Sequence, residues 1–310
     1  MRFWLRKAGG TLLAALGATL LVSLFLDLIP GDPAAILLGE QAQSLDVAAL
    51  RRQMWLDRPL PVQAWLFLEE LATGELRSSV PPFQERVWGR LAEAVPKTGL
   101  LALLAMACAL AIGLPLGVLS ARRAGRAVDR AAMGLAVLAI SAPAFLVGQA
   151  LILAFGIRLG WLPIAGDDSS AAVLLPALTL GLALSALLSR VTRASMLEVQ
   201  GKEWVLSARA RGLSERKVTW RYAFRSAAVP ILTIAGLQFG GVLTGAVVVE
   251  KVFNWPGLGT YLLTSIERRD YNGVRACVLV FTLTYLAVNL LTDAVCAWVD
   301  PRVRLSTKAP

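Results

Sequence analysis

Six long apolar stretches, separated by charged segments, constrain this chain more than any other feature. A helix that spans a bilayer needs about 20 predominantly apolar residues, because it rises about 1.5 Å per residue through a core of about 30 Å. The chain is 56% hydrophobic, above the roughly 45–50% that is typical of soluble domains. We therefore predict an all-α membrane protein with six transmembrane helices. Their approximate bounds are 8–29, 98–121, 131–155, 173–188, 227–249 and 274–299, and the fourth is expected to extend into its flanks.

The first apolar stretch follows a basic start, so a cleaved signal peptide is an alternative interpretation. The stretch is longer than the usual core of a signal peptide, and no convincing small-residue cleavage site precedes the turn at Pro30. We therefore expect it to be retained as the first span.

The distribution of basic residues predicts the orientation, since Lys and Arg near the spans are retained on the cytoplasmic side. With the N-terminus placed inside, 19 of the 31 basic residues are cytoplasmic. Both termini are therefore predicted to be cytoplasmic. The net charge is +10, and the charged residues lie mostly between the apolar stretches. Membrane topology therefore explains the charge better than a nucleic-acid partner, which we do not expect.

These spans divide the chain into four parts. Residues 1–29 form the cytoplasmic N-terminus and the first helix, and 30–96 form a small external subdomain of short helices, interrupted by prolines. Residues 97–299 hold the second to sixth helices with the cytoplasmic loop 190–225, and 300–310 form a cytoplasmic tail.

Several kinds of chemistry are not expected on this chain. The sequence has no histidine, which excludes histidine-based catalysis. Its three cysteines, Cys108, Cys277 and Cys296, lie in or beside apolar stretches without the CxxC spacing of metal or redox sites. The phosphate-binding pattern GxxxxGK[ST] is absent. We predict no metal, no cofactor, no ATP binding and no enzymatic activity here.

The fifth stretch contains two interlocked GxxxG pairs, a spacing that lets another helix backbone approach closely. The glycines either allow tight packing within the chain or lie on a helix that lines a pore or an interface with another subunit. The glycines are Gly236, Gly240, Gly241 and Gly245.

Polar residues within the spans are candidates for a translocation pathway, because a polar group in a membrane usually faces protein or water. The candidates are Gln149, Gln238, Asn289 and Asp293. For Asp293, a structural partner is the alternative.

A turn-forming segment follows the fifth stretch and contains Asn254, Trp255, Pro256 and Gly257. It is either a simple interfacial anchor, which suits the aromatic side chain, or the start of a short external helix that covers a pathway.

The loop 190–225 carries nine basic and three acidic residues. Residues 203–211 favour a helix, Gly212 is a plausible stop, and Ser214 is placed to cap a second helix. Such a loop can simply fix topology beside anionic membrane lipid. The small residues Ser207, Ala208 and Ala210, together with Gly212, favour close approach by another protein instead.

At these residues the sequence resembles the permease subunits of binding-protein-dependent ABC importers, in the branch for dipeptides, oligopeptides, glutathione and nickel. The resemblance covers nearly the whole chain. It rests on residues 30–33 (PGDP), 56–60 (LDRPL), 141–145 (SAPAF), 193–196 (RASM), 208–214, 249–259 (VEKVFNWPGLG), 269–271 (RDY) and 300–304 (DPRVR).

The resemblance implies a type I ABC importer permease fold in a bacterial or archaeal cytoplasmic membrane. It implies a second homologous permease subunit, two ATPase subunits that carry ATP and Mg, and an external solute-binding protein. In that family the loop after the fourth span docks on an ATPase. Ala208 and Gly212 match its motif, whereas Leu206 and Ser207 depart from it. The residues thereby implied are Glu203, Ser207, Ala208, Arg209, Ala210, Arg211, Gly212, Leu213 and Ser214, and 254–257 would face the binding protein.

The function implied is half of a translocation pathway for short peptides, with glutathione as the first guess. A nickel or metal-chelate permease of the same family is the nearest alternative. A stand-alone secondary transporter and a membrane hydrolase that uses Asp27 and Asp293 are rivals from other classes. Our topology opposes the hydrolase, because it places these two residues near opposite membrane faces.

Overall fold

The computed structural model describes residues 33–38, 44–80 and 85–299, together with seven isolated helical positions between 10 and 24. The regular elements within these ranges are helices joined by turns and loops, and one antiparallel bridge, between Arg77 and Arg86, is the only described strand-like pairing. The predicted helical class is therefore confirmed. Most of the predicted first span, Asp27 and the tail lie outside the described residues.

The chain divides into two compact units, whose boundaries fall within α5 (Val87–Arg122), between Trp255 and Pro256, and within α14 (Tyr271–Val299). The first unit comprises residues up to 98 together with 256–286. Besides its parts of α5 and α14, it contains α2 (Pro33–Leu38), α3 (Ser44–Gln53), α4 (Leu60–Thr73) and α13 (Leu258–Glu267).

Local sequence sets the bounds of α4. Pro59 precedes it, and a proline at the helix start loses no hydrogen bond. Gly74 ends it with a φ of 75°, a left-handed conformation that glycine adopts without strain.

An apolar cluster and a buried polar pair are among the contacts that hold the helices of the first unit. Ala34, Leu50, Met54 and Tyr271 form the cluster. Arg275 is 1% exposed, and its Nη2 donates a 2.9 Å hydrogen bond to Oε1 of Gln63, which is also buried.

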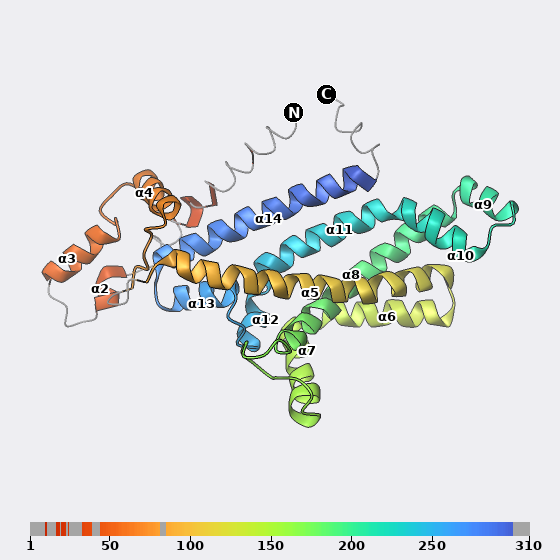
Figure 1. Ribbon diagram of the computed structural model, residues 1–310, viewed down its shortest axis with the longest axis horizontal. Coiled ribbons are helices and arrows are strands. Elements are labelled where there is room, and N and C mark those ends of the chain that lie inside the picture. Colours follow the sequence, from red (N-terminus) through yellow and green to blue (C-terminus); the bar gives the residue numbers. More distant parts are fainter. Residues whose placement is uncertain are drawn as a thin grey trace. The chain divides into compact units, whose positions relative to one another are not determined.

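The second unit comprises residues 99–255 and 287–299 of the described chain, and α8 (Leu174–Gln200) is its central helix. The helices α6, α7 and α11 all pack against α8 (Figure 1). The elements besides the parts of α5 and α14 are α6 (Ala127–Ser141), α7 (Ala144–Leu151), the π-helical segment η1 (Ile152–Arg158), α8, α9 (Glu203–Ala210), α10 (Glu215–Lys217), the π-helical segment η2 (Val218–Ala223), α11 (Phe224–Gly245) and α12 (Val247–Val252).

Close contact between α5 and α8 depends on glycine. A Cβ at Gly117 would lie 2.5 Å from Cβ of Thr192, and one at Gly113 would lie 3.1 Å from Cβ of Leu188. On α8, a Cβ at Gly181 would lie 2.7 Å from Cβ of Cys108. Gly113 and Gly117 form a GxxxG pair that the sequence reasoning overlooked.

Four described helices are long and apolar enough to cross a membrane, and they correspond to the second, fourth, fifth and sixth predicted spans. They are Val87–Arg122, Leu174–Gln200, Glu215–Thr244 and Tyr271–Val299.

The third predicted span differs from expectation, because it is not one straight helix. It is the pair Ala127–Ser141 and Ala144–Arg158, bent by 102°. Pro143 lacks an N–H and disfavours helical geometry at the preceding residue, and Ala142 indeed has an extended ψ of 124°.

Candidate functional site

The loop that follows α8 folds as the short helix α9, a tight turn, and the start of the long helical span Glu215–Thr244, which begins with α10. Gly212 has a φ of 76°, and its N–H donates a 2.9 Å hydrogen bond to the carbonyl of Arg209. The predicted stop at Gly212 is confirmed. The helix that follows was expected to be short, but it continues through η2 into α11. Ser214 precedes α10 as expected, but its hydroxyl makes no capping hydrogen bond, so that detail was wrong. Figure 1 shows α9 and α10 beyond the ends of α8 and α11.

One face of α9 is fixed inside the second unit. Val205 and Ala208 are 0% exposed and pack in a cluster with Met196 of α8, Val218 of η2 and Ala227 of α11. Ala208 was expected in a small-residue surface that another protein approaches. Its spacing of three from Val205 places it on the buried face instead. Ala208 therefore holds α9 on its own chain.

The opposite face of α9 and the turn after it are exposed. Arg209 is partly exposed, and its Nε donates a 2.9 Å hydrogen bond to Oε1 of Glu215 across the turn. Leu213 is half-buried. The exposed residues are Glu203, Trp204, Leu206, Ser207, Ala210, Arg211, Gly212 and Ser214. The arrangement presents charged and apolar side chains on one face of a helix whose other face is packed in the second unit.

An ion pair between a buried aspartate and a half-buried arginine joins three helices of the second unit and the turn between two of them. Asp129 on α6 is 3% exposed and accepts hydrogen bonds from Nε and Nη2 of Arg193 on α8, at 2.6 and 2.8 Å. It also accepts from Oγ of Ser120 on α5 and, at 2.8 Å, from the N–H of Gly125 in the intervening turn. The sequence reasoning missed this pair. The only signal was an acid among basic residues at the start of the third span.

The four pathway candidates lie on three helices of the second unit. Gln238 on α11 donates a 3.2 Å hydrogen bond from Nε2 to the carbonyl of Leu184, while its buried Oε1 has no partner among the described residues. Gln149 on α7 and Asp293 on α14 are exposed, and Asn289 is half-buried. A common pathway remains a prediction.

The glycines of α11 separate into different roles. A Cβ at Gly236 would collide with the side chain of Thr292, so this glycine lets α11 and α14 pack closely within the chain. Gly241 is exposed, and a Cβ there would meet nothing within 4 Å. Gly240 is buried, and Gly245 ends α11.

The segment 254–257 was expected at an external surface, but only part of it is exposed. Asn254 is exposed and Pro256 is half-buried. Trp255 is 4% exposed and packs with Phe253 in an apolar cluster of the second unit. Gly257 is buried just before α13. Trp255 is thus not an exposed interfacial anchor.

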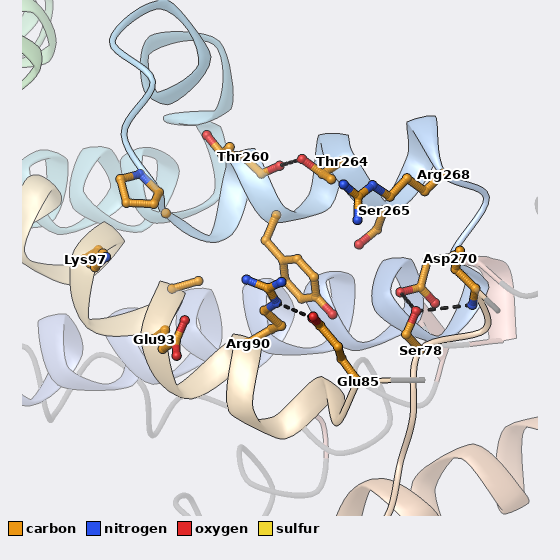
Figure 2. A pocket seen from close by; sticks show the side chains of 15 residues that line it. Ser78, Glu85, Arg90, Glu93, Lys97, Thr260, Thr264, Ser265, Arg268 and Asp270 are labelled. Carbon is orange, nitrogen blue, oxygen red and sulfur yellow. Dashed lines mark hydrogen bonds and ion pairs between the residues drawn. The ribbon is translucent and has the colours of Figure 1, made fainter. Parts of the chain in front are cut away.

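The first unit contains a cavity of about 330 Å³ between the start of α5 and α13 (Figure 2). On its wall, Nε of Arg90 lies 2.6 Å from Oε2 of Glu85. Tyr261 also lines it, and burial is the main cause that raises the pKa of its phenol.

Asp270 lies at one end of this cavity, and its carboxylate organises the neighbouring backbone. It accepts hydrogen bonds from Oγ of Ser78 at 2.7 Å, from the N–H of Ser79 at 2.8 Å and from the N–H of Gly273 at 3.1 Å. This carboxylate therefore connects residues 78–79, which lie between the bridge partners Arg77 and Arg86, to the start of α14.

A family model described as "Binding-protein-dependent transport system inner membrane component" matches residues 113–305. This chain belongs to that family. The corresponding N-terminal family model matches residues 1–101. The predicted resemblance is confirmed, and the chain is a multi-pass inner-membrane permease subunit of a binding-protein-dependent transport system.

Relatives match this member of the family over nearly their whole length. The "Glutathione transport system permease protein GsiC" of Pectobacterium atrosepticum is 39% identical over 304 residues, which cover 98% of this chain and 99% of the relative. The protein of the same name from Escherichia coli K12 is 40% identical over 286 residues, which cover 92% and 93%.

Solved structures share the fold of this inner-membrane component. Two inward-facing forms of the MetNI methionine ABC transporter match with TM-scores of 0.58 and 0.59, at 18% and 15% identity. The matches cover 69% and 68% of this chain and 98% and 96% of the other chains. This chain therefore shares its fold with a chain of an ABC transporter.

Proposed function

We propose that this permease subunit forms half of the translocation pathway of an ATP-driven importer of short peptides, and that residues 203–215 couple it to separate ATPase subunits. The observation that carries the coupling role is the two-sided nature of α9. Its inner face is packed against α8, η2 and α11, and its outer face is exposed.

This geometry gives a mechanism. Closure of the ATPases around ATP pushes on the outer face of α9. Because Val205 and Ala208 are buried in the same cluster as Met196 and Ala227, a displacement of α9 moves the ends of α8 and α11 with it. The bundle then alternates between states that open outward and inward. ATP and Mg belong to the ATPase subunits in this proposal.

The proposed topology has six spans with both termini in the cytoplasm. The stretch 8–29 supplies the first span, the bent pair α6–α7 supplies the third, and residues 30–96 form the external subdomain. The loop 190–225 and the tail 300–310 face the ATPases. A second homologous permease completes the pathway, and the binding protein docks outside, near the exposed Asn254.

Glutathione is the substrate that we propose first, because relatives at 39–40% identity carry glutathione transport in their names. Gln149, Gln238, Asn289 and Asp293 are proposed to line the pathway. A nickel or metal-chelate permease remains the alternative within the family.

Reconstitution tests this proposal. The chain, its partner permease and both ATPases are placed in liposomes, and uptake of labelled glutathione, a dipeptide and nickel is measured with the binding protein present. We expect peptide uptake that requires ATP and the binding protein. Nickel uptake alone would favour the alternative, and uptake by this chain without ATPases would overturn the coupling role.

A further inference from the structure

The ion pair between Asp129 and Arg193 lies at the same end of the second unit as α9. Arg193 is three residues from Met196, which packs against the buried face of α9. Ser120, which donates to Asp129, is adjacent to Ala121, another member of that cluster. The ion pair therefore lies beside the apolar cluster that packs against α9, and we refer to the two together as one structural block.

The carboxylate of Asp129 has no remaining acceptor position to fill. Arg193 binds both oxygens in a bidentate manner, and Ser120 and Gly125 each bind one of them. Bidentate pairing fixes orientation as well as distance. A buried, saturated carboxylate of this kind holds α5, the following turn and α6 to α8 in one arrangement.

The arginines of the same turn behave differently. Arg122, Arg123, Arg126 and Arg130 are all exposed, whereas the Arg193 side chain is 29% exposed and meets the buried acid. The four exposed arginines are available to attract anionic lipid or another protein. The Asp129–Arg193 pair instead fixes how the helices of the second unit are arranged.

We infer that Asp129 and Arg193 are positioning residues, which lock the α5–α6 turn to α8 so that a displacement of α9 is passed to α6. This inference rests on the proposed coupling role of α9. The 102° bend between α6 and α7 is then where the relayed movement is accommodated, because Pro143 has already interrupted the helical hydrogen bonding there.

The test compares coupling with stability in the complete reconstituted transporter. The variants are Asp129→Asn, Arg193→Gln and the double variant, and Arg126→Gln is the control because it removes an exposed arginine from the same turn. Uptake per ATP hydrolysed and the midpoint of thermal unfolding are measured for each. The single variants should lose both coupling and stability.

The double variant separates the two roles. It removes both charges, so no buried charge is left unpaired and stability should largely return. Because the bidentate contact is still lost, uptake per ATP should stay several-fold below that of the wild type and of Arg126→Gln. Recovery of coupling together with stability would overturn the inference.

A distance measurement gives a readout that does not depend on transport. Spin labels replace the exposed Val128 on α6 and Glu198 on α8, with the three native cysteines changed to alanine. The inference predicts a single distance between the two spin labels, and this distance should stay the same when ATP is trapped on the transporter. After Asp129→Asn, a second distance between the labels should appear. A nucleotide-dependent change in the wild-type background would contradict a rigid block. A wild-type complex without ATP-driven uptake would instead refute the proposed function.

Discussion

Asp129 in the second unit and Asp270 in the first are both buried carboxylates with hydrogen bonds to each oxygen, but their donors differ. Asp129 is bound by a guanidinium, a hydroxyl and one backbone N–H. The three described donors to Asp270 are a hydroxyl and two backbone N–H groups, all neutral.

The difference shows what each aspartate stabilises. Asp270 satisfies backbone donors in a turn, so its contacts define local geometry. Asp129 joins helices that are far apart in sequence, and its charged partner makes its loss more serious. Removal of one member of a buried ion pair costs about 3–5 kcal/mol, whereas an unsatisfied neutral donor costs about 1–3 kcal/mol. The second unit should therefore be the more sensitive of the two.

The largest effect is expected for Arg193→Ala. The change leaves the Asp129 carboxylate, 4% exposed, without its charged partner, and we expect a loss of about 3–5 kcal/mol in the free energy of unfolding. Unfolding in mixed detergent micelles measures it, with Arg126→Ala as the exposed control. A loss no larger than that of the control would show that the ion pair contributes little.

A smaller effect is expected from glycines on α5, which belongs to both units. Gly117→Ala in the second unit places a methyl group against Thr192 and should destabilise the protein by about 1–3 kcal/mol. Gly89→Ala in the first unit meets nothing within 4 Å and should stabilise it by about 0.5–1 kcal/mol through helix propensity. The same unfolding assay compares them, and equal effects would contradict the close contact of α5 with α8.

Asp270→Asn should have a still smaller effect, about 1 kcal/mol. The amide oxygen can still accept from the N–H groups of Ser79 and Gly273, which both donate to Oδ1, and the NH₂ group then faces the Ser78 hydroxyl. Because a neutral amide oxygen is a weaker acceptor than a carboxylate, hydrogen–deuterium exchange should rise slightly at Ser79 and Gly273, while α8 and α9 stay protected. Faster exchange in α9 would show that the two units are not independent.

The smallest effect concerns Glu70 on α4, whose pKa is raised by burial first and then by the charges of Glu75 and Glu69. A raised carboxyl pKa means that the charged form destabilises the folded state, and that this penalty fades as the pH falls through the folded pKa towards the unfolded value. Glu70→Gln should therefore slightly raise the stability at pH 7. The advantage should disappear near pH 4, and an advantage that does not depend on pH would refute the assigned cause.

Hydropathy predicted the second, fourth, fifth and sixth spans, because a helix that crosses a bilayer needs about 20 mainly apolar residues. It did not predict the start of α5 at Val87, where Glu93 and Lys97 lower the apolar content although the residues are helical. Pro143 predicts an interruption of the helix, but a proline does not determine the angle between the two helical segments. The 102° bend depends on how α6 and α7 pack against α8.

The shape of the loop 190–225 was predicted in outline, since Gly212 and the helix before it follow local rules. The burial of Ala208 was not predicted, because a small residue is suitable for an internal contact as well as an external one. Asp129 and Arg193 are 64 positions apart in the sequence, and no local sequence pattern predicts a contact between them. Trp255 was misassigned for a similar reason, because its burial depends on distant helices.

The proposed coupling role of α9 is tested most directly by uptake per ATP hydrolysed in liposomes that hold the complete transporter. Gly212→Leu introduces a side chain at a φ of 76°, and Gly160→Leu does the same at a φ of 62° away from α9. Both sites have open space, and the expected cost to stability is similar, about 1–2 kcal/mol. Gly212→Leu should abolish most uptake while the binding protein still captures substrate, and Gly160→Leu should not. Equal uptake by both variants and the wild type would contradict coupling through residues 203–215.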